Sequence, residues 1–139
     1  MFQIRNLGFK AILWGVLSDT FGTLIVATIL FRALSSAGFS EAEITLRMHG
    51  FSGLTLMLIL GLSFTLIGGY VAGRTAGRLE ILHGAIVGGI GLVLGLFFRE
   101  PGLPVWYEII SFAMMLPIGM AGGSLAREGN RKRNASGTS

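Results

Sequence analysis

Four long apolar runs, separated by short polar connections, constrain the fold of this 139-residue chain more than any other feature. Each run is close to the roughly 20 residues that an α-helix needs to cross the hydrocarbon core of a bilayer. Charged residues make up only 13% of the chain and fall almost entirely outside these runs. The sequence therefore predicts an all-α membrane protein, an up-down bundle of four transmembrane helices with spans at about 11–31, 51–72, 81–98 and 105–126.

The segments outside the runs predict the domain organisation. Residues 1–126 are expected to form the transmembrane domain, and residues 127–139 a basic, disordered cytoplasmic tail. A short surface helix is expected at 41–48, because Ser40 and Glu43 have capping-box spacing. Glu43 and Arg47 are also opposite charges four residues apart.

The distribution of basic residues predicts the orientation. Eight lysines and arginines fall on the side that holds both termini and the connection between the second and third spans, and three fall on the other side. The positive-inside rule therefore predicts that both termini are cytoplasmic. The pI near 10.4 also suggests nucleic-acid binding as an alternative interpretation of the basic residues. No segment outside the membrane is large enough to carry a basic binding face, so lipids are expected as partners and nucleic acid is not.

Glycines recur at helical spacing in three of the predicted spans. Because glycine has no side chain, helix backbones can approach closely where lipid removes the hydrophobic incentive to associate. The pattern predicts helix packing, either within a homo-oligomer or with a larger membrane complex. The helix-packing glycines are Gly69, Gly73, Gly84, Gly88, Gly91, Gly95, Gly119 and Gly123.

Asp19 is the sharpest single candidate for function. It lies about ten residues into the first span, close to the bilayer midplane. A carboxylate at that depth is costly, so such residues usually face the bundle or water and often serve function. Two interpretations are open: a coupling carboxylate for transport, or one polar step with Ser18 and Thr20 that binds a neighbouring helix.

His83, Arg74 and Arg78 form the second polar candidate, at the connection between the second and third spans. They suggest a proton-sensing or headgroup-binding cluster, since basic residues at this interface favour anionic lipid. The alternative is a histidine bonded to the preceding turn beside ordinary positive-inside arginines. No metal site is expected, because the chain has no cysteine and its other histidine, His49, falls on the opposite side. Glu108 is expected to be a solvated interfacial charge.

Two hairpins of the chain resemble each other. Residues 12–15 (ILWG) align with residues 81–84 (ILHG), and residues 68–72 (GGYVA) with residues 122–126 (GGSLA). Spans one and two and spans three and four are therefore candidates for a duplicated hairpin in one orientation. Glycine-rich apolar sequences also align by chance, so chance similarity is the alternative.

The run from Gly68 to Gly89, GGYVAGRTAGRLEILHGAIVGG, resembles a motif of a family of small bacterial four-helix integral membrane proteins of uncharacterised function. The matching residues are Gly68, Gly69, Tyr70, Ala72, Arg74, Leu82, His83, Gly84 and Ala85. The resemblance implies a four-helix protein of the bacterial inner membrane. It brings no activity or cofactor with it.

These features predict a small multi-pass membrane protein. The first hypothesis is an accessory or structural subunit that acts through glycine-mediated packing, because the sequence shows small-residue stripes and no polar cavity. The alternative is a small transporter or channel that uses Asp19 as a coupling carboxylate. An enzyme is not expected, because no cluster of catalytic residue types gathers near one interface.

Overall fold

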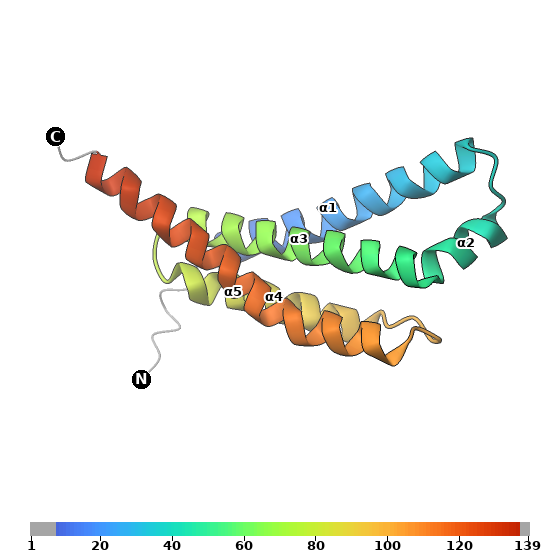
Figure 1. Cartoon of the computed structure of the whole chain (residues 1–139). Coiled ribbons are helices and arrows are strands. Elements are labelled where there is room, and N and C mark those ends of the chain that lie inside the picture. Colours follow the sequence, from blue (N-terminus) through green and yellow to red (C-terminus); the bar gives the residue numbers. More distant parts are fainter. Residues whose placement is uncertain (1–7, 137–139) are drawn as a thin grey trace.

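The structure, a computed structural model, describes residues 8–136 and is built from helices (Figure 1). Four of them are long and apolar enough to cross a membrane, which confirms the all-α bundle and indicates a small multi-pass membrane protein. A short helix, α2, joins the first two. The helices are α1 (Phe9–Ser36), α2 (Glu41–His49), α3 (Phe51–Ala76), α4 (Glu80–Phe97) and α5 (Val105–Ser136).

The bundle has two ends that differ in packing (Figure 1). We call the end with both chain termini and the α3–α4 turn the terminal end, and the end with α2 and the α4–α5 connection the distal end. The helices lie close together at the terminal end, and α1 diverges from the others towards the distal end (Figure 1). Buried residues in α3, α4 and α5 accordingly concentrate towards the terminal end.

The α3–α4 turn is tight because two residues adopt left-handed backbone conformations. Gly77 ends α3 with φ of 64° and donates its N–H to the carbonyl of Gly73 at 3.1 Å. Glycine takes this conformation without the steric cost that a Cβ brings. Leu79 follows with φ of 50° and precedes α4 directly. The turn therefore sets α3 and α4 antiparallel and adjacent.

The short helix α2 forms where the capping box predicts it. The Glu43 carboxylate accepts hydrogen bonds from the backbone N–H of Ser40 at 2.8 Å and from its hydroxyl at 2.7 Å. These bonds hold the pKa of Glu43 below its usual value. The Arg47 guanidinium lies 4.2 Å from the ring centroid of Phe39, which is a cation–π contact.

Several glycines lie where two backbones approach within one chain. A Cβ on Gly69 or on Gly84 would collide with the carbonyl oxygen of Gly119, and a Cβ on Gly88 with that of Met115. Gly123 meets the backbone of α4 at Glu80 in the same way. Helices α3 and α4 therefore both lie against the glycine face of α5.

The prediction of a disordered tail is wrong for residues 127–136, the part of the tail that the structure describes. Helix α5 continues without a break through Ser136. Asn130 is buried there, and its side-chain amide donates to Glu80 Oε1 at 3.1 Å and to the Gly73 carbonyl at 3.5 Å. These contacts with α3 and α4 favour helix over disorder, as do the arginines and lysine of the segment, which are good helix formers. Residues 137–139 lie outside the described part.

Candidate functional site: a cavity at Asp19

Helix α1 places Asp19 against α3 in the middle of the bundle. Its carboxylate oxygens lie 3.3 and 3.4 Å from the hydroxyl oxygen of Thr65, a buried residue of α3. The Thr65 hydroxyl also lies 3.2 Å from the Gly61 carbonyl. Since a threonine hydroxyl has one proton to donate, Asp19 and the Gly61 carbonyl compete for the same donor.

The other members of the predicted polar step play no comparable part. The Ser18 hydroxyl donates to the Trp14 carbonyl of its own helix at 2.8 Å. Thr20 lies on the wall of the cavity described below. Among these three residues, only Asp19 forms a side-chain hydrogen bond with another helix in the part of the chain that the structure describes.

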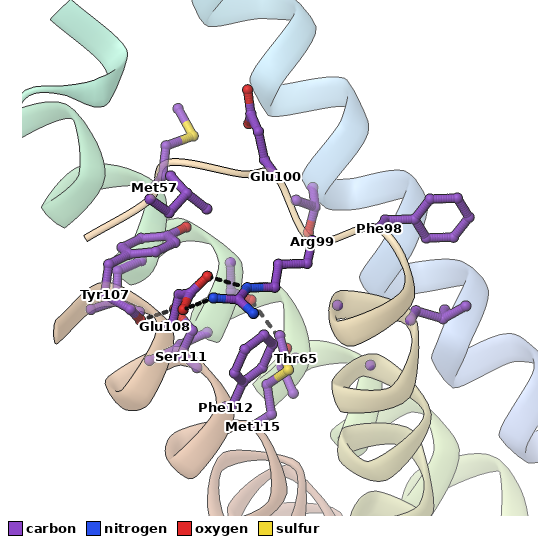
Figure 2. A pocket seen from close by; sticks show the side chains of 18 of the residues that line it. Met57, Thr65, Phe98, Arg99, Glu100, Tyr107, Glu108, Ser111, Phe112 and Met115 are labelled. Carbon is purple, nitrogen blue, oxygen red and sulfur yellow. Dashed lines mark hydrogen bonds and ion pairs between the residues drawn. The ribbon is translucent and has the colours of Figure 1, made fainter. Parts of the chain in front are cut away.

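A cavity of about 640 Å³ extends from the distal end of the bundle to Asp19. Figure 2 shows side chains that line it, from Glu100 and Tyr107 to Thr65 and Met115. Nothing in the sequence pointed to this mostly apolar cavity, because the residues that line it come from segments far apart in the chain. Its inner end is formed by Asp19, Thr65, Gly91 and Met115, and its remaining walls include Met57, Leu58, Leu94, Gly95, Phe98, Tyr107, Ser111 and Phe112.

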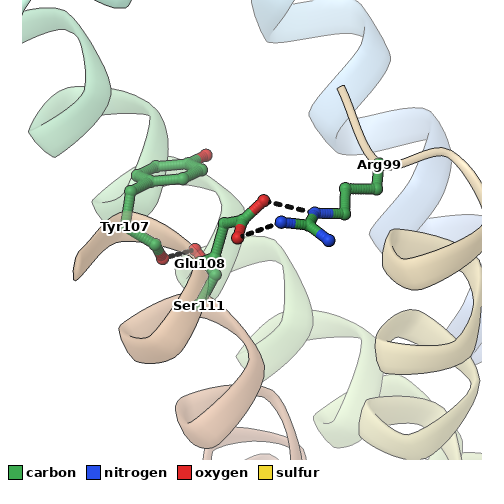
Figure 3. Close-up of polar contacts among 4 residues, drawn as sticks. All are labelled: Arg99, Tyr107, Glu108 and Ser111. Carbon is green, nitrogen blue, oxygen red and sulfur yellow. Dashed lines mark hydrogen bonds and ion pairs between the residues drawn. The ribbon is translucent and has the colours of Figure 1, made fainter. Parts of the chain in front are cut away.

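An ion pair lies at the wall of the cavity near its distal end (Figure 3). The Arg99 guanidinium binds both carboxylate oxygens of Glu108, through Nε to Oε1 and through Nη2 to Oε2 at 2.7 Å. These hydrogen bonds raise the pKa of Arg99. The Glu108 side chain is only 13% exposed. Glu108 is therefore a paired, largely covered carboxylate, and its prediction as a solvated charge is wrong.

A second contact joins α2 to the α4–α5 connection at the same end. His49 Nε2 lies 3.4 Å from Glu100 Oε1, and both residues line the cavity. His49 Nδ1 lies 2.9 Å from the Thr45 carbonyl, to which it donates as an N–H. The contact with Glu100 becomes an ion pair when the imidazole is protonated.

Asp19 differs from the other carboxylates of the cavity because no basic side chain lies beside it in the part of the chain that the structure describes. Three acidic side chains line the cavity, and Glu108 and Glu100 have Arg99 and His49 as partners. Asp19 has hydrogen-bond contact with Thr65 and no ion pair in the part of the chain that the structure describes. Its inner position and its lack of a counter-ion make it the side chain best placed to bind a ligand.

His83 lies at the opposite, terminal end and is separate from this cavity. It is fully buried, and its Nδ1 lies 3.0 Å from the Leu79 carbonyl, as the bond to the preceding turn predicts. Its Nε2 accepts the Gly8 N–H at 3.0 Å, so the proton of the neutral ring is on Nδ1. His83 thereby binds the first turn of α1 to α4.

The two predicted arginines do not gather around His83 in a described contact. Arg74 extends towards α5, where a Cβ on Gly129 would lie 2.5 Å from Arg74 Nη1. Arg78 is exposed in the α3–α4 turn. Within residues 8–136, no three His, Cys, Asp or Glu side chains are placed to hold a metal ion.

Sequence reasoning missed Thr65, Arg99 and Glu108 as parts of one site with Asp19. One signal was present, because Arg99 and Glu108 have opposite charges and flank a short connection that contains two prolines. Such a connection brings the end of one helix beside the start of the next. No protein-family model, curated protein or solved structure matches the chain.

Proposed function

We propose that this protein is a small membrane transporter in which Asp19 binds the transported solute or a coupling proton. The observation that carries the proposal is the position of Asp19 at the inner end of a cavity among four membrane-spanning helices, with no counter-ion among the residues that the structure describes. Carboxylates at such depth usually mark a path for ions or substrates.

The unequal packing of the two ends supports the same proposal. The cavity reaches Asp19 from the distal end, and beyond Asp19 the helices close on one another through Gly15, Gly68 and Val87. A site that is accessible from one side and closed on the other is half of an alternating-access cycle. The second half requires the terminal end to separate while the distal end closes.

We place the protein in the bacterial inner membrane, with both termini and the α3–α4 turn in the cytoplasm. The charge bias of the sequence and its resemblance to the small four-helix bacterial family support this placement. The two termini do lie at the same end of the bundle (Figure 1). In this orientation the cavity opens away from the cytoplasm.

An accessory role is the second candidate, and helix α1 is the observation that favours it. The part of α1 that diverges from the bundle exposes large apolar side chains, among them Phe21, Leu24, Ile25 and Ile29. A partner helix or a second copy of the chain would cover this face. The glycine contacts described above are already made within one chain, so they do not by themselves require a partner. Purification from native membranes in mild detergent tests this role, and a monomer without a partner would contradict it.

The transport proposal is tested by proton movement in liposomes that contain the purified protein and an internal pH dye. We expect a transported solute, when it is added outside the liposomes, to change the internal pH through the wild-type protein. The control Glu128→Gln removes an exposed carboxylate of α5, and we expect it to give the same response. We expect Asp19→Asn to abolish this response. Solute-induced proton movement in Asp19→Asn equal to that of the wild type would refute the proposal.

A further inference from the structure

The charged side chains that line the cavity indicate the charge of the ligand that it binds. Arg99 and Glu108 neutralise each other, and His49 lies against Glu100. The uncompensated charge that remains at the inner end is one carboxylate, Asp19. A half-buried carboxylate such as Asp19 attracts a positive charge and repels anions. A dication would bring one charge more than this site neutralises.

The number of oxygen ligands argues against a bare metal ion. At the inner end, a cation would meet the Asp19 carboxylate and the Thr65 hydroxyl. Calcium takes about six to eight oxygen ligands, and magnesium about six in a strict octahedron. The Gly61 carbonyl beside the Thr65 hydroxyl adds one backbone oxygen. Gly91 and Met115 add no side-chain oxygen. An ammonium group needs only a carboxylate and one or two hydrogen-bond or van der Waals neighbours.

The lining and size of the cavity describe the rest of the ligand. The cavity walls carry thioether and aromatic side chains, including Met57, Met115 and Phe112 (Figure 2). Methionine adapts its shape to irregular apolar groups, and aromatic rings attract cations. The volume of about 640 Å³ falls in the range of sites for small organic ligands. An ammonium group alone would leave most of this apolar space unfilled.

We infer that the cavity binds an amphipathic organic monocation, with its charged nitrogen at Asp19 and its apolar body against Met57, Phe112 and Met115. This inference rests on the proposal that the Asp19 cavity is the solute site. It adds the chemical class of the solute: a substituted ammonium compound with an apolar or aromatic body.

The test is direct binding to the full chain in nanodiscs of zwitterionic phosphatidylcholine, which avoids attraction of the probe to anionic lipid. The probe is a dansyl-labelled benzyltrimethylammonium compound, compared with its neutral isostere in which carbon replaces the quaternary nitrogen. We expect the wild type to bind the cation about ten- to a hundredfold more tightly than the isostere, because the Asp19 carboxylate attracts the quaternary nitrogen by charge alone and desolvation offsets part of that attraction. We expect Asp19→Asn to bind both compounds with equal, weak affinity.

A second pair of variants keeps the carboxylate and changes access to it. The methyl group of Gly91→Ala would lie 3.5 Å from Asp19 Oδ2, an ordinary contact that the fold accommodates. The methyl group of Gly89→Ala, on the same helix, would meet only Leu116 at 3.9 Å and does not line the cavity. We expect Gly91→Ala to weaken binding of the cation several-fold and Gly89→Ala to leave it unchanged.

The outcomes separate this inference from the proposed function. Equal affinity of the wild type for the cation and its isostere, or a preference for the cation that survives in Asp19→Asn, would overturn the inference. Asp19-dependent proton movement driven by neutral solutes, without a preference for the cation, would overturn the inference and leave the transport proposal standing. A cation preference that depends on Asp19, without proton movement, would support the inference and refute transport coupled through Asp19.

Discussion

Gly119 is the position where the close packing of α4 on α5 can be tested most sharply. In Gly119→Ala, the new methyl group would collide with the Gly84 carbonyl oxygen and lie 3.0 Å from the Gly88 nitrogen. These are backbone atoms, so no side-chain rotation can relieve the contact and the helices have to separate. Overpacking of this kind typically costs about 1–3 kcal/mol.

Gly61→Ala is the matched control, because it makes the same substitution in a membrane-spanning helix where no atom of another helix lies within 4 Å of the new methyl group. Both variants gain the helix propensity of alanine over glycine, about 1 kcal/mol. The difference between the two variants therefore isolates the packing cost. We expect Gly119→Ala to be less stable than Gly61→Ala by about 1–3 kcal/mol.

The assay is reversible unfolding in mixed micelles with increasing dodecyl sulfate, followed by circular dichroism and by the fluorescence of the two tryptophans. Circular dichroism before unfolding shows whether each variant starts from the same helical content. If Gly119→Ala unfolds at the same dodecyl sulfate fraction as Gly61→Ala, or at a higher one, the reasoning about backbone contact at Gly119 is wrong.

Two further predictions concern the ends of α1 and α2. His83→Ala removes the acceptor of the Gly8 N–H. We therefore expect faster hydrogen exchange at the Gly8 amide and a decrease of about 1–3 kcal/mol in the free energy of unfolding. The control His49→Ala, at an exposed histidine, should change neither quantity, and an unchanged exchange rate at Gly8 in His83→Ala would contradict the prediction. Ser40→Ala removes the hydroxyl that donates to Glu43, and we expect the pKa of Glu43 to rise towards its ordinary value. Because the folded-state pKa of Glu43 is lowered, its hydrogen bonds stabilise α2 at neutral pH and lose that effect as the pH falls through the folded-state pKa. NMR titration of Glu43 in both proteins measures the shift, and identical titration curves would refute it.

The helices of this protein follow from the sequence because lipid imposes a simple rule. Backbone groups in hydrocarbon must bond internally, so each apolar run of sufficient length becomes a helix. Local signals were equally reliable: the capping box at Ser40 forms as predicted, and His83 bonds to the Leu79 carbonyl one turn earlier. In each case the deciding interactions lie within a few residues of one another.

The cavity could not be predicted in the same way, because it depends on how far the helices separate. Gly84, Gly88, Gly91 and Gly95 form one stripe in the sequence, and nothing in their spacing distinguishes them. In the structure, Gly84 and Gly88 lie against the backbone of α5, whereas Gly91 and Gly95 line the cavity. The divergence of helices towards the distal end makes this difference, and it is a property of the whole bundle.

The uninterrupted length of α5 has a mechanical consequence. At 1.5 Å per residue, its 32 residues extend about 48 Å, and the hydrocarbon core of a bilayer is only about 30 Å thick. The outer part of α5 therefore extends beyond the hydrocarbon core into water. Any tilt of α5 that opens the closed half of the bundle also displaces this outer part. A spectroscopic label at Arg133 would therefore report, from outside the membrane, on a rearrangement of the helices within it.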